Sequence, residues 1–127
     1  MFYTSYFAKI KAIKEKYPNM LLVSISHDKP KFLENDETIE NWGILGPIRS
    51  LLNDYKSGKC DEAEYTERYN LYLHKMWPSI QNMFYHKYYT SVDIVMLCYE
   101  KPDAFCHRHL LAHFLNDHEI PCEELDV

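Results

Sequence analysis

The residues best suited to chemistry lie close together near the C-terminal end of the sequence. Cys98 and Glu100 end an apolar stretch, and Cys106, His107 and Arg108 follow a short polar segment. A thiol at a helix start, beside a histidine and an arginine, loses its proton more readily than a free cysteine, whose pKa is ~8.5. One hypothesis is therefore that Cys106 is a nucleophile, or that Glu100 and His107 form an acid–base pair. The alternative is that Cys106 is an inert residue of the helix start, and both interpretations remain open.

Arg108 is the cation that most clearly indicates a ligand. A planar guanidinium beside a helix N-terminus suits bidentate binding of a phosphate or carboxylate. An internal salt bridge between Arg108 and Glu100 is the alternative, and the two roles are compatible. Cys98 ends a buried strand and is more typical of a core residue, but its position makes it a candidate ligand-binding residue.

Metal binding must be weighed, because two cysteines and three histidines occur between residues 98 and 113. His109 and His113 are four residues apart and share a helix face. His107 and His109 diverge by about 200° around the same helix, so the three histidines do not face one ion. We therefore predict no metal and no cofactor.

A strand, a loop and a helix within 93–115 position these residues. Ile94 to Leu97 is an apolar run of the length of a strand buried on both faces. Lys101-Pro102-Asp103 predicts a loop, and the apolar spacing after it predicts a helix that begins at 104–106. This geometry directs backbone N–H groups and the positive end of a helix dipole toward the strand end.

The rest of the chain alternates short apolar stretches with amphipathic ones. We predict strands at 2–4 and 20–25, and an edge strand near 120–125 that Pro121 restricts. Helices are predicted after Ser5 as a cap, at Pro47, after Asp61 as a cap, and at Pro78 through Tyr88. Residues 32–46 have weak periodicity, so we interpret them as a lid, a covering loop or a dimer contact.

Apolar strands separated by helices predict an α/β domain, 1–127, with a small, mainly parallel sheet of about four strands. Ligands of such sheets bind beyond the carboxyl ends of the strands. The polar residues expected at that edge, besides those already named, are Thr4, Ser5, Tyr6, Ser24 and Ser26. Arg68 and Tyr69 follow a capping aspartate and are further candidates for the crevice, although an amphipathic helix with a surface arginine fits the same pattern.

Composition excludes several classes of protein. The formal net charge of −5 disfavours general binding to duplex nucleic acid. No leader peptide and no run of about 18 apolar residues is visible, so we predict a cytoplasmic protein without a membrane span. Four cysteines in such a compartment favour reduced thiols over a disulfide framework. The eleven tyrosines suit a core rim or a ligand pocket equally.

Three stretches resemble the family catalogued as domain of unknown function 488. They are Tyr3–Ala8, Tyr65–Tyr69, and the specific segment Leu97–Pro102 with Phe105–Leu110, which carries Cys-Tyr-Glu-Lys and Cys-His-Arg. The resemblance implies a compact, three-layer Rossmann-like fold flanked by helices, and it favours Cys98, Glu100, Cys106, His107 and Arg108 as the working site. It does not imply a reaction.

The leading hypothesis is a domain that binds a nucleotide-like or other anionic small molecule, with sequestration of a signalling nucleotide as one role. The first alternative is a cysteine- or Glu/His-dependent enzyme acting on a nucleoside, a nucleotide or a nucleic-acid base. The second is a structural partner in a DNA-modification or defence complex, such as a phage-related one. The oligomeric state is not fixed, and a homo-oligomer stays open.

Overall fold

The sheet of this protein consists of five parallel strands. The structure is a computed structural model, and it describes residues 1–86, 91–100 and 104–127. The strand order is β3-β2-β4-β1-β5, and every pairing among the described residues is parallel. The strands are β1 (Phe2–Tyr6), β2 (Leu21–Ser24), β3 (Glu40–Asn41), β4 (Ile94–Cys98) and β5 (Cys122–Glu124). The predicted α/β fold with a mainly parallel sheet is confirmed, with one strand more than expected. The added strand is β3.

β4 lies in the middle of the sheet and pairs with β1 and β2. All five of its residues are buried. Ile94 and Met96 join one hydrophobic core, whereas Val95 and Leu97 join the core on the opposite face. Burial on both faces explains why the strand is a continuous apolar run rather than an alternating one.

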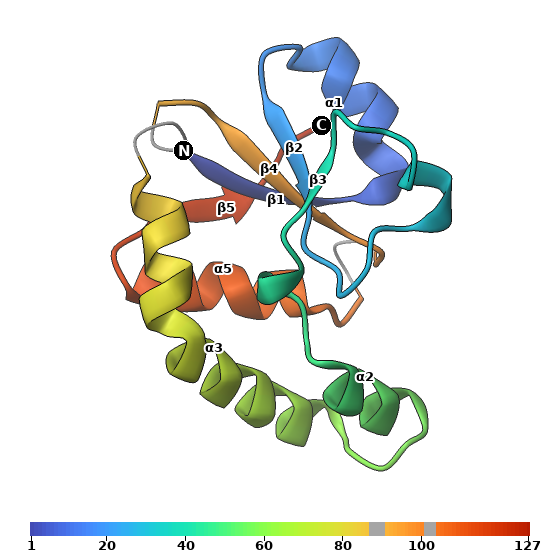
Figure 1. Cartoon of the computed structure of the whole chain (residues 1–127), viewed down its shortest axis with the longest axis vertical. Coiled ribbons are helices and arrows are strands. Elements are labelled where there is room, and N and C mark those ends of the chain that lie inside the picture. Colours follow the sequence, from blue (N-terminus) through green and yellow to red (C-terminus); the bar gives the residue numbers. More distant parts are fainter. Residues whose placement is uncertain (87–90, 101–103) are drawn as a thin grey trace.

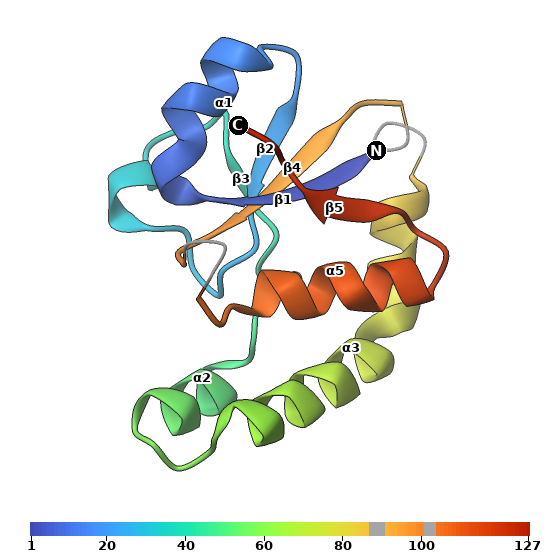
Figure 2. The ribbon, with the colours of Figure 1, turned by 180° about the vertical axis from the view of Figure 1, so that it is seen from behind.

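Helices cover both faces of the sheet, as Figures 1 and 2 show from opposite sides. α1 (Ile10–Lys16) lies on one face, and α5 (His107–Asp117) lies on the other. α2 (Arg49–Lys56) leads into the long α3 (Glu62–Tyr85), which packs against α5 on the side away from the sheet. The result is approximately the three-layer, Rossmann-like arrangement that the sequence predicts.

The prediction of a separate helix that starts at Pro78 is wrong. Pro78 lies inside α3, which runs without interruption from Glu62 and changes direction along its length (Figure 1). A helix accommodates an internal proline by bending, because the proline removes one backbone N–H and its ring crowds the preceding turn. The predicted cap is confirmed, since the Asp61 carboxylate accepts a hydrogen bond from the backbone N–H of Glu64 at 2.8 Å. Tyr88 lies outside the described residues.

Ser5 does not cap a helix, contrary to the prediction. It lies inside β1, buried and in register with Leu97 of β4. A 3-10 turn at Phe7–Lys9 follows, and α1 begins only at Ile10, without a side-chain cap. The extended pairing of β1 with two neighbouring strands outweighs the local capping preference of one serine.

The segment 32–46 is packed against the domain. Its buried side chains are Leu33, Ile39, Trp42 and Leu45. It contains β3 and 3-10 turns at Lys31–Leu33 and Gly43–Leu45. Its contribution to both cores is that of a structural element rather than of a loosely attached lid.

Candidate functional site

The carboxyl end of β4 and the start of α5 meet at one place. Cys98 is the last residue of β4, Cys106 is the N-cap of α5, and His107 and Arg108 form its first turn. The predicted helix start is therefore confirmed. The intervening Lys101, Pro102 and Asp103, predicted as a loop, lie outside the described residues.

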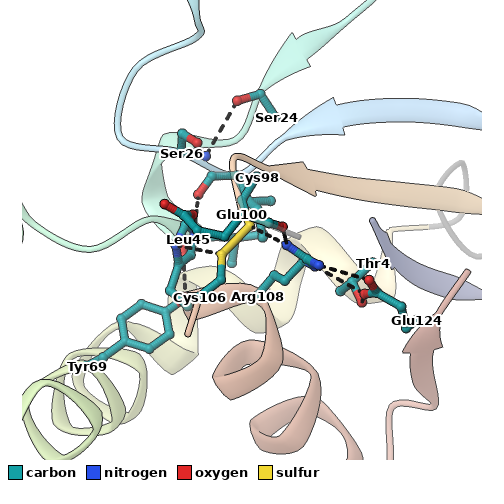
Figure 3. The surroundings of a disulfide bond; sticks show 12 residues. Thr4, Ser24, Ser26, Leu45, Tyr69, Cys98, Glu100, Cys106, Arg108 and Glu124 are labelled. Atoms are coloured by element: carbon teal, nitrogen blue, oxygen red, sulfur yellow. Dashed lines mark hydrogen bonds and ion pairs between the residues drawn. A yellow bond between two sulfur atoms is a disulfide. The ribbon is translucent and has the colours of Figure 1, made fainter. Parts of the chain in front are cut away.

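Cys98 and Cys106 are joined by a disulfide bond (Figure 3). Their Cα atoms are 7.6 Å apart. The prediction of reduced thiols is wrong for this pair, because the chain returns from the strand end to the helix start and brings the two sulfur atoms together. Cys60 and Cys122 are free and buried, and burial raises the pKa of the Cys122 thiol to about 12.

Arg108 is fully buried, and protein atoms surround its guanidinium group. Its Nε and Nη2 atoms donate to the two carboxylate oxygens of Glu124 at 3.1 and 2.9 Å, a bidentate ion pair. Nη1 donates to Cys98 Sγ at 3.1 Å and to the backbone carbonyl of Glu100 (Figure 3). The internal salt bridge therefore exists, but its carboxylate belongs to Glu124 of β5 rather than to Glu100.

Two of the predicted residues of β1, Thr4 and Tyr6, lie beside this ion pair. Thr4 donates its hydroxyl proton to Glu124 at 2.6 Å, and the Tyr6 ring lies 5.5 Å from the guanidinium carbon of Arg108. Ser5 is also buried, but it lies between these two residues on β1, so its side chain points to the opposite face of the sheet. Parallel pairing places Tyr6 in register with Cys98 and Thr4 in register with Glu124, beside Arg108. Thr4 thus holds the carboxylate of Glu124 in place, and Tyr6 packs against the guanidinium of Arg108.

His107 is held in one orientation by the end of β2. Its Nε2 atom lies 2.7 Å from the carbonyl oxygen of Ile25, so Nε2 carries the proton and donates it. Nδ1 is left as an acceptor, 3.9 Å from Cys106 Sγ. Burial lowers the pKa of His107 to about 4, so the imidazole is neutral near pH 7. The Tyr69 ring stands edge-on to it at 5.7 Å.

A pocket of about 390 Å³ opens beside His107, beyond the carboxyl ends of β2 and β4. This is the edge at which the sequence predicted a ligand. The pocket is lined by Ser26, His27, Asp28, Pro47, Arg49, Leu52, Lys56, Tyr99, Glu100 and His107. The lining therefore combines two cations, two carboxylates and an exposed tyrosine ring.

The two predicted serines differ in their surroundings. Ser24 is buried, and its hydroxyl oxygen accepts a hydrogen bond from the backbone N–H of Ser26 at 3.4 Å. Ser26 lines the pocket, and its own buried hydroxyl has no hydrogen-bond partner within the described residues. A buried hydroxyl without a partner is costly, and a bound ligand could satisfy it.

Arg68 and Tyr69 lie apart from the pocket. Arg68 pairs with Asp54 at 2.9 Å, and this bond raises the pKa of the guanidinium. Tyr69 is buried, donates its hydroxyl proton to the carbonyl oxygen of Leu45, and has a raised pKa because of burial. Arg68 thus links α3 to α2 through its ion pair, whereas the Tyr69 ring packs against the His107 ring.

Sequence reasoning did not find Glu124, Arg49 or Lys56. Arg49 and Lys56 are seven residues apart on α2, a spacing that places two side chains on one helix face, but their approach to β4 depends on tertiary packing. Glu124 occurs in a short acidic stretch, and only the packing of α5 against β5 reveals it as the partner of Arg108.

The parallel sheet, with helices on both faces, defines a Rossmann-like α/β domain whose cysteine–histidine–arginine motif lies at the carboxyl edge of the sheet. The chain belongs to domain of unknown function 488: residues 5–119 match the model described as the active DUF488-N3 subclade. Comparison with curated proteins and with solved structures found no match. Among the described residues, no helix combines the length and apolarity that crossing a membrane requires.

Proposed function

We propose that the protein binds a small anionic molecule of the nucleotide-like class in the pocket beside His107. The observation that carries this proposal is the pocket itself, which combines cationic, aromatic and hydrogen-bonding groups at the edge where parallel α/β sheets bind ligands. Its volume lies within the usual range for small-molecule sites, ~300–1,000 Å³.

Arg49 and Lys56 are the groups suited to the anion. Arg49 already contacts Asp28 at 3.0 Å, but both side chains are largely exposed, at 65% and 75%, and can rearrange at little cost. Lys56 makes no ion pair with any described residue and lies on the same helix. These two cations take the role that the sequence assigned to Arg108, whose guanidinium is committed to internal partners.

The remaining walls suit a base or another flat ring. Tyr99 is 55% exposed and stands edge-on to Phe7, so its outer face is available for stacking. Leu52 and Pro47 supply apolar surface, and the Ser26 hydroxyl supplies a hydrogen bond deeper in the pocket. Sequestration of a signalling nucleotide requires binding without a reaction, and these binding groups suffice for that role.

The test is a titration followed by backbone amide NMR, with inorganic phosphate, nucleoside monophosphates and nucleoside diphosphates. Shifts should concentrate at Ser26, His27 and Tyr99, and the double substitution Arg49→Ala with Lys56→Ala should weaken affinity at least about tenfold. Lys11→Ala, an exposed lysine of α1, is the matched control and should leave affinity unchanged. Unaltered affinity in the double variant would refute the proposal.

A second candidate function is thiol-dependent catalysis, favoured by the Cys106–His107 contact. Three groups form a chain of contacts: Cys106 Sγ as the nucleophile, His107 Nδ1 as the base, and the Ile25 carbonyl, which orients the base. The description of the matching subclade as active is consistent with an enzyme. The reaction requires the reduced protein, since the disulfide occupies Cys106 Sγ.

Alkylation by iodoacetamide at pH 6–7, read out for each cysteine by peptide mass spectrometry, tests this candidate. Cys106 of the reduced protein should react faster than Cys122, whose thiol pKa is raised by burial, and His107→Gln should slow it. Equal rates at the two cysteines would count against a nucleophilic Cys106.

A further inference from the structure

We propose that the reduced protein binds one divalent metal ion of the zinc class through Cys98, Cys106 and His107. One ligand atom from each of these buried residues lies within 4.8 Å of the others. Two thiolates and one imidazole form a donor set that zinc prefers. The sequence argument against a metal concerned three histidines on one helix, whereas this set needs only one.

The second observation is that hydrogen bonds with neighbouring groups orient two of the proposed metal ligands, His107 and Cys98. A histidine that binds a metal through one ring nitrogen usually donates the other N–H to a carbonyl or carboxylate. His107 has this arrangement, because Nε2 donates to the Ile25 carbonyl at 2.7 Å and Nδ1 faces Cys106. Arg108 donates to Cys98 Sγ at 3.1 Å and so holds this sulfur beside the other two donors.

Backbone spacing favours a bridging ion over a direct sulfur–sulfur link. The Cα atoms of Cys98 and Cys106 are 7.6 Å apart, beyond the usual disulfide range of ~4.4–6.8 Å. A tetrahedral zinc with Zn–S bonds of ~2.3 Å holds its two sulfurs about 3.8 Å apart, which lengthens the path between the two backbones.

Charge balance also suits a buried position. Two thiolates cancel the charge of a divalent ion, so the site adds no net charge to a region that Arg108 and Glu124 already neutralise. The three protein donors leave the fourth position of a tetrahedral ion open, as in catalytic zinc sites. His107 lines the pocket, so a ligand there would have access to the ion; this last step rests on the proposed binding function.

The experiment titrates the fully reduced, metal-free protein with cobalt(II), whose tetrahedral thiolate complexes absorb in the visible range. We expect one ion per chain and a thiolate-to-cobalt charge-transfer band, both displaced by zinc. Cys98→Ser, Cys106→Ser and His107→Gln should each weaken binding at least about tenfold, since ligand removal costs a metal bond. Cys60→Ser, Cys122→Ser and His113→Gln are matched controls outside the cluster and should bind as the unsubstituted protein does.

A second measurement needs no variant and so does not depend on their folding. Zinc should protect Cys98 and Cys106 of the unsubstituted protein from alkylation while leaving the rates of Cys60 and Cys122 unchanged, and prior oxidation to the disulfide should abolish cobalt binding. Unprotected Cys98 and Cys106 at saturating zinc, or a cobalt spectrum that survives in Cys106→Ser, would overturn the metal site. Anion titrations of the metal-free protein test the pocket separately, so either proposal can fail without the other.

Discussion

Arg108 and Glu124 form an ion pair in which the cation is completely buried and the carboxylate is 30% exposed. The guanidinium bridges three segments of the chain, because it contacts β5, the sulfur of Cys98 and the carbonyl of Glu100. A buried arginine of this kind fixes the position of the groups around it. Its partner is therefore a structural determinant of the site.

Removal of the carboxylate charge should be costly. Glu124→Gln leaves a buried guanidinium without its counter-ion, and we expect the free energy of unfolding to fall by about 2–4 kcal/mol in urea denaturation. Asp28→Asn, which breaks the exposed pair with Arg49, should cost less than about 1 kcal/mol. Equal costs for the two substitutions would contradict the structural role of Glu124.

His107 should make stability depend on pH between about 4 and 6.5. Its folded-state pKa of about 4 lies below the ordinary value of 6.5, so the unfolded chain binds a proton in this window while the folded protein does not. Stability is therefore complete above pH 6.5 and declines as pH falls toward 4. Between pH 7 and pH 5 the loss should be about 2 kcal/mol in the disulfide-bonded protein.

Comparison with variants isolates this contribution from that of other groups. Urea denaturation of His107→Gln should lack the loss of about 2 kcal/mol, whereas His113→Gln, with a side chain that is 79% exposed, should retain it. A His107→Gln protein with an unchanged pH profile would show that His107 titrates normally in the fold.

At the scale of elements, the contact between Gly46 and the end of β2 shapes the pocket. A Cβ atom at Gly46 would lie 2.8 Å from the backbone nitrogen of His27 and 2.9 Å from the carbonyl oxygen of Ile25. Both are main-chain atoms, so the steric clash can be removed only if the segment around Gly46 moves away from residues 25–27. The same Ile25 carbonyl orients His107, and the contact therefore couples the 32–46 segment to the site.

Gly46→Ala should lower the free energy of unfolding by about 1–3 kcal/mol through overpacking and shift the NMR signals of the His107 ring. Gly58→Ala is the control: its positive φ of 80° makes alanine unfavourable there by ~1–2 kcal/mol, but nothing lies within 4 Å. That variant should leave the His107 signals in place. Matching spectral changes in both variants would show that the effect is not local.

At the scale of the whole molecule, rigidity and solvent access are unevenly distributed. β4 is central and buried at every position, whereas Leu51 is the buried residue of α2. α2 carries Arg49 and Lys56, so the cations proposed to hold the anion belong to a peripheral helix (Figure 2). Local opening is expected where few apolar contacts hold an element.

Hydrogen exchange should reflect this difference. Amides of β4 should exchange only through global unfolding, with rates that follow the urea dependence of the whole molecule, and amides of α2 should exchange faster through local opening. Mass spectrometry of peptides that cover the two elements measures both. Equal protection would indicate that α2 and β4 unfold as one unit.

The sequence by itself determined the elements whose pattern reflects local physics. The uninterrupted apolar run at 94–97 predicts a strand buried on both faces, and Asp61 marks a helix start, because both signals depend on neighbouring residues alone. The start of α5 directly after its N-cap Cys106 follows from the apolar spacing of the helix, which places the Cys-His-Arg group beside the strand end.

Tertiary structure decided which partners these groups have. Glu124 is 16 residues from Arg108 along the chain, and Ile25 is 82 residues from His107. The packing of α5 against the sheet brings each pair together. The disulfide link of Cys98 with Cys106, the position of Ser5 inside β1, and the continuity of α3 through Pro78 likewise depend on packing that outweighs local preference. Local sequence specifies which groups can react, whereas burial and register, set by the whole chain, decide which of them are free to do so.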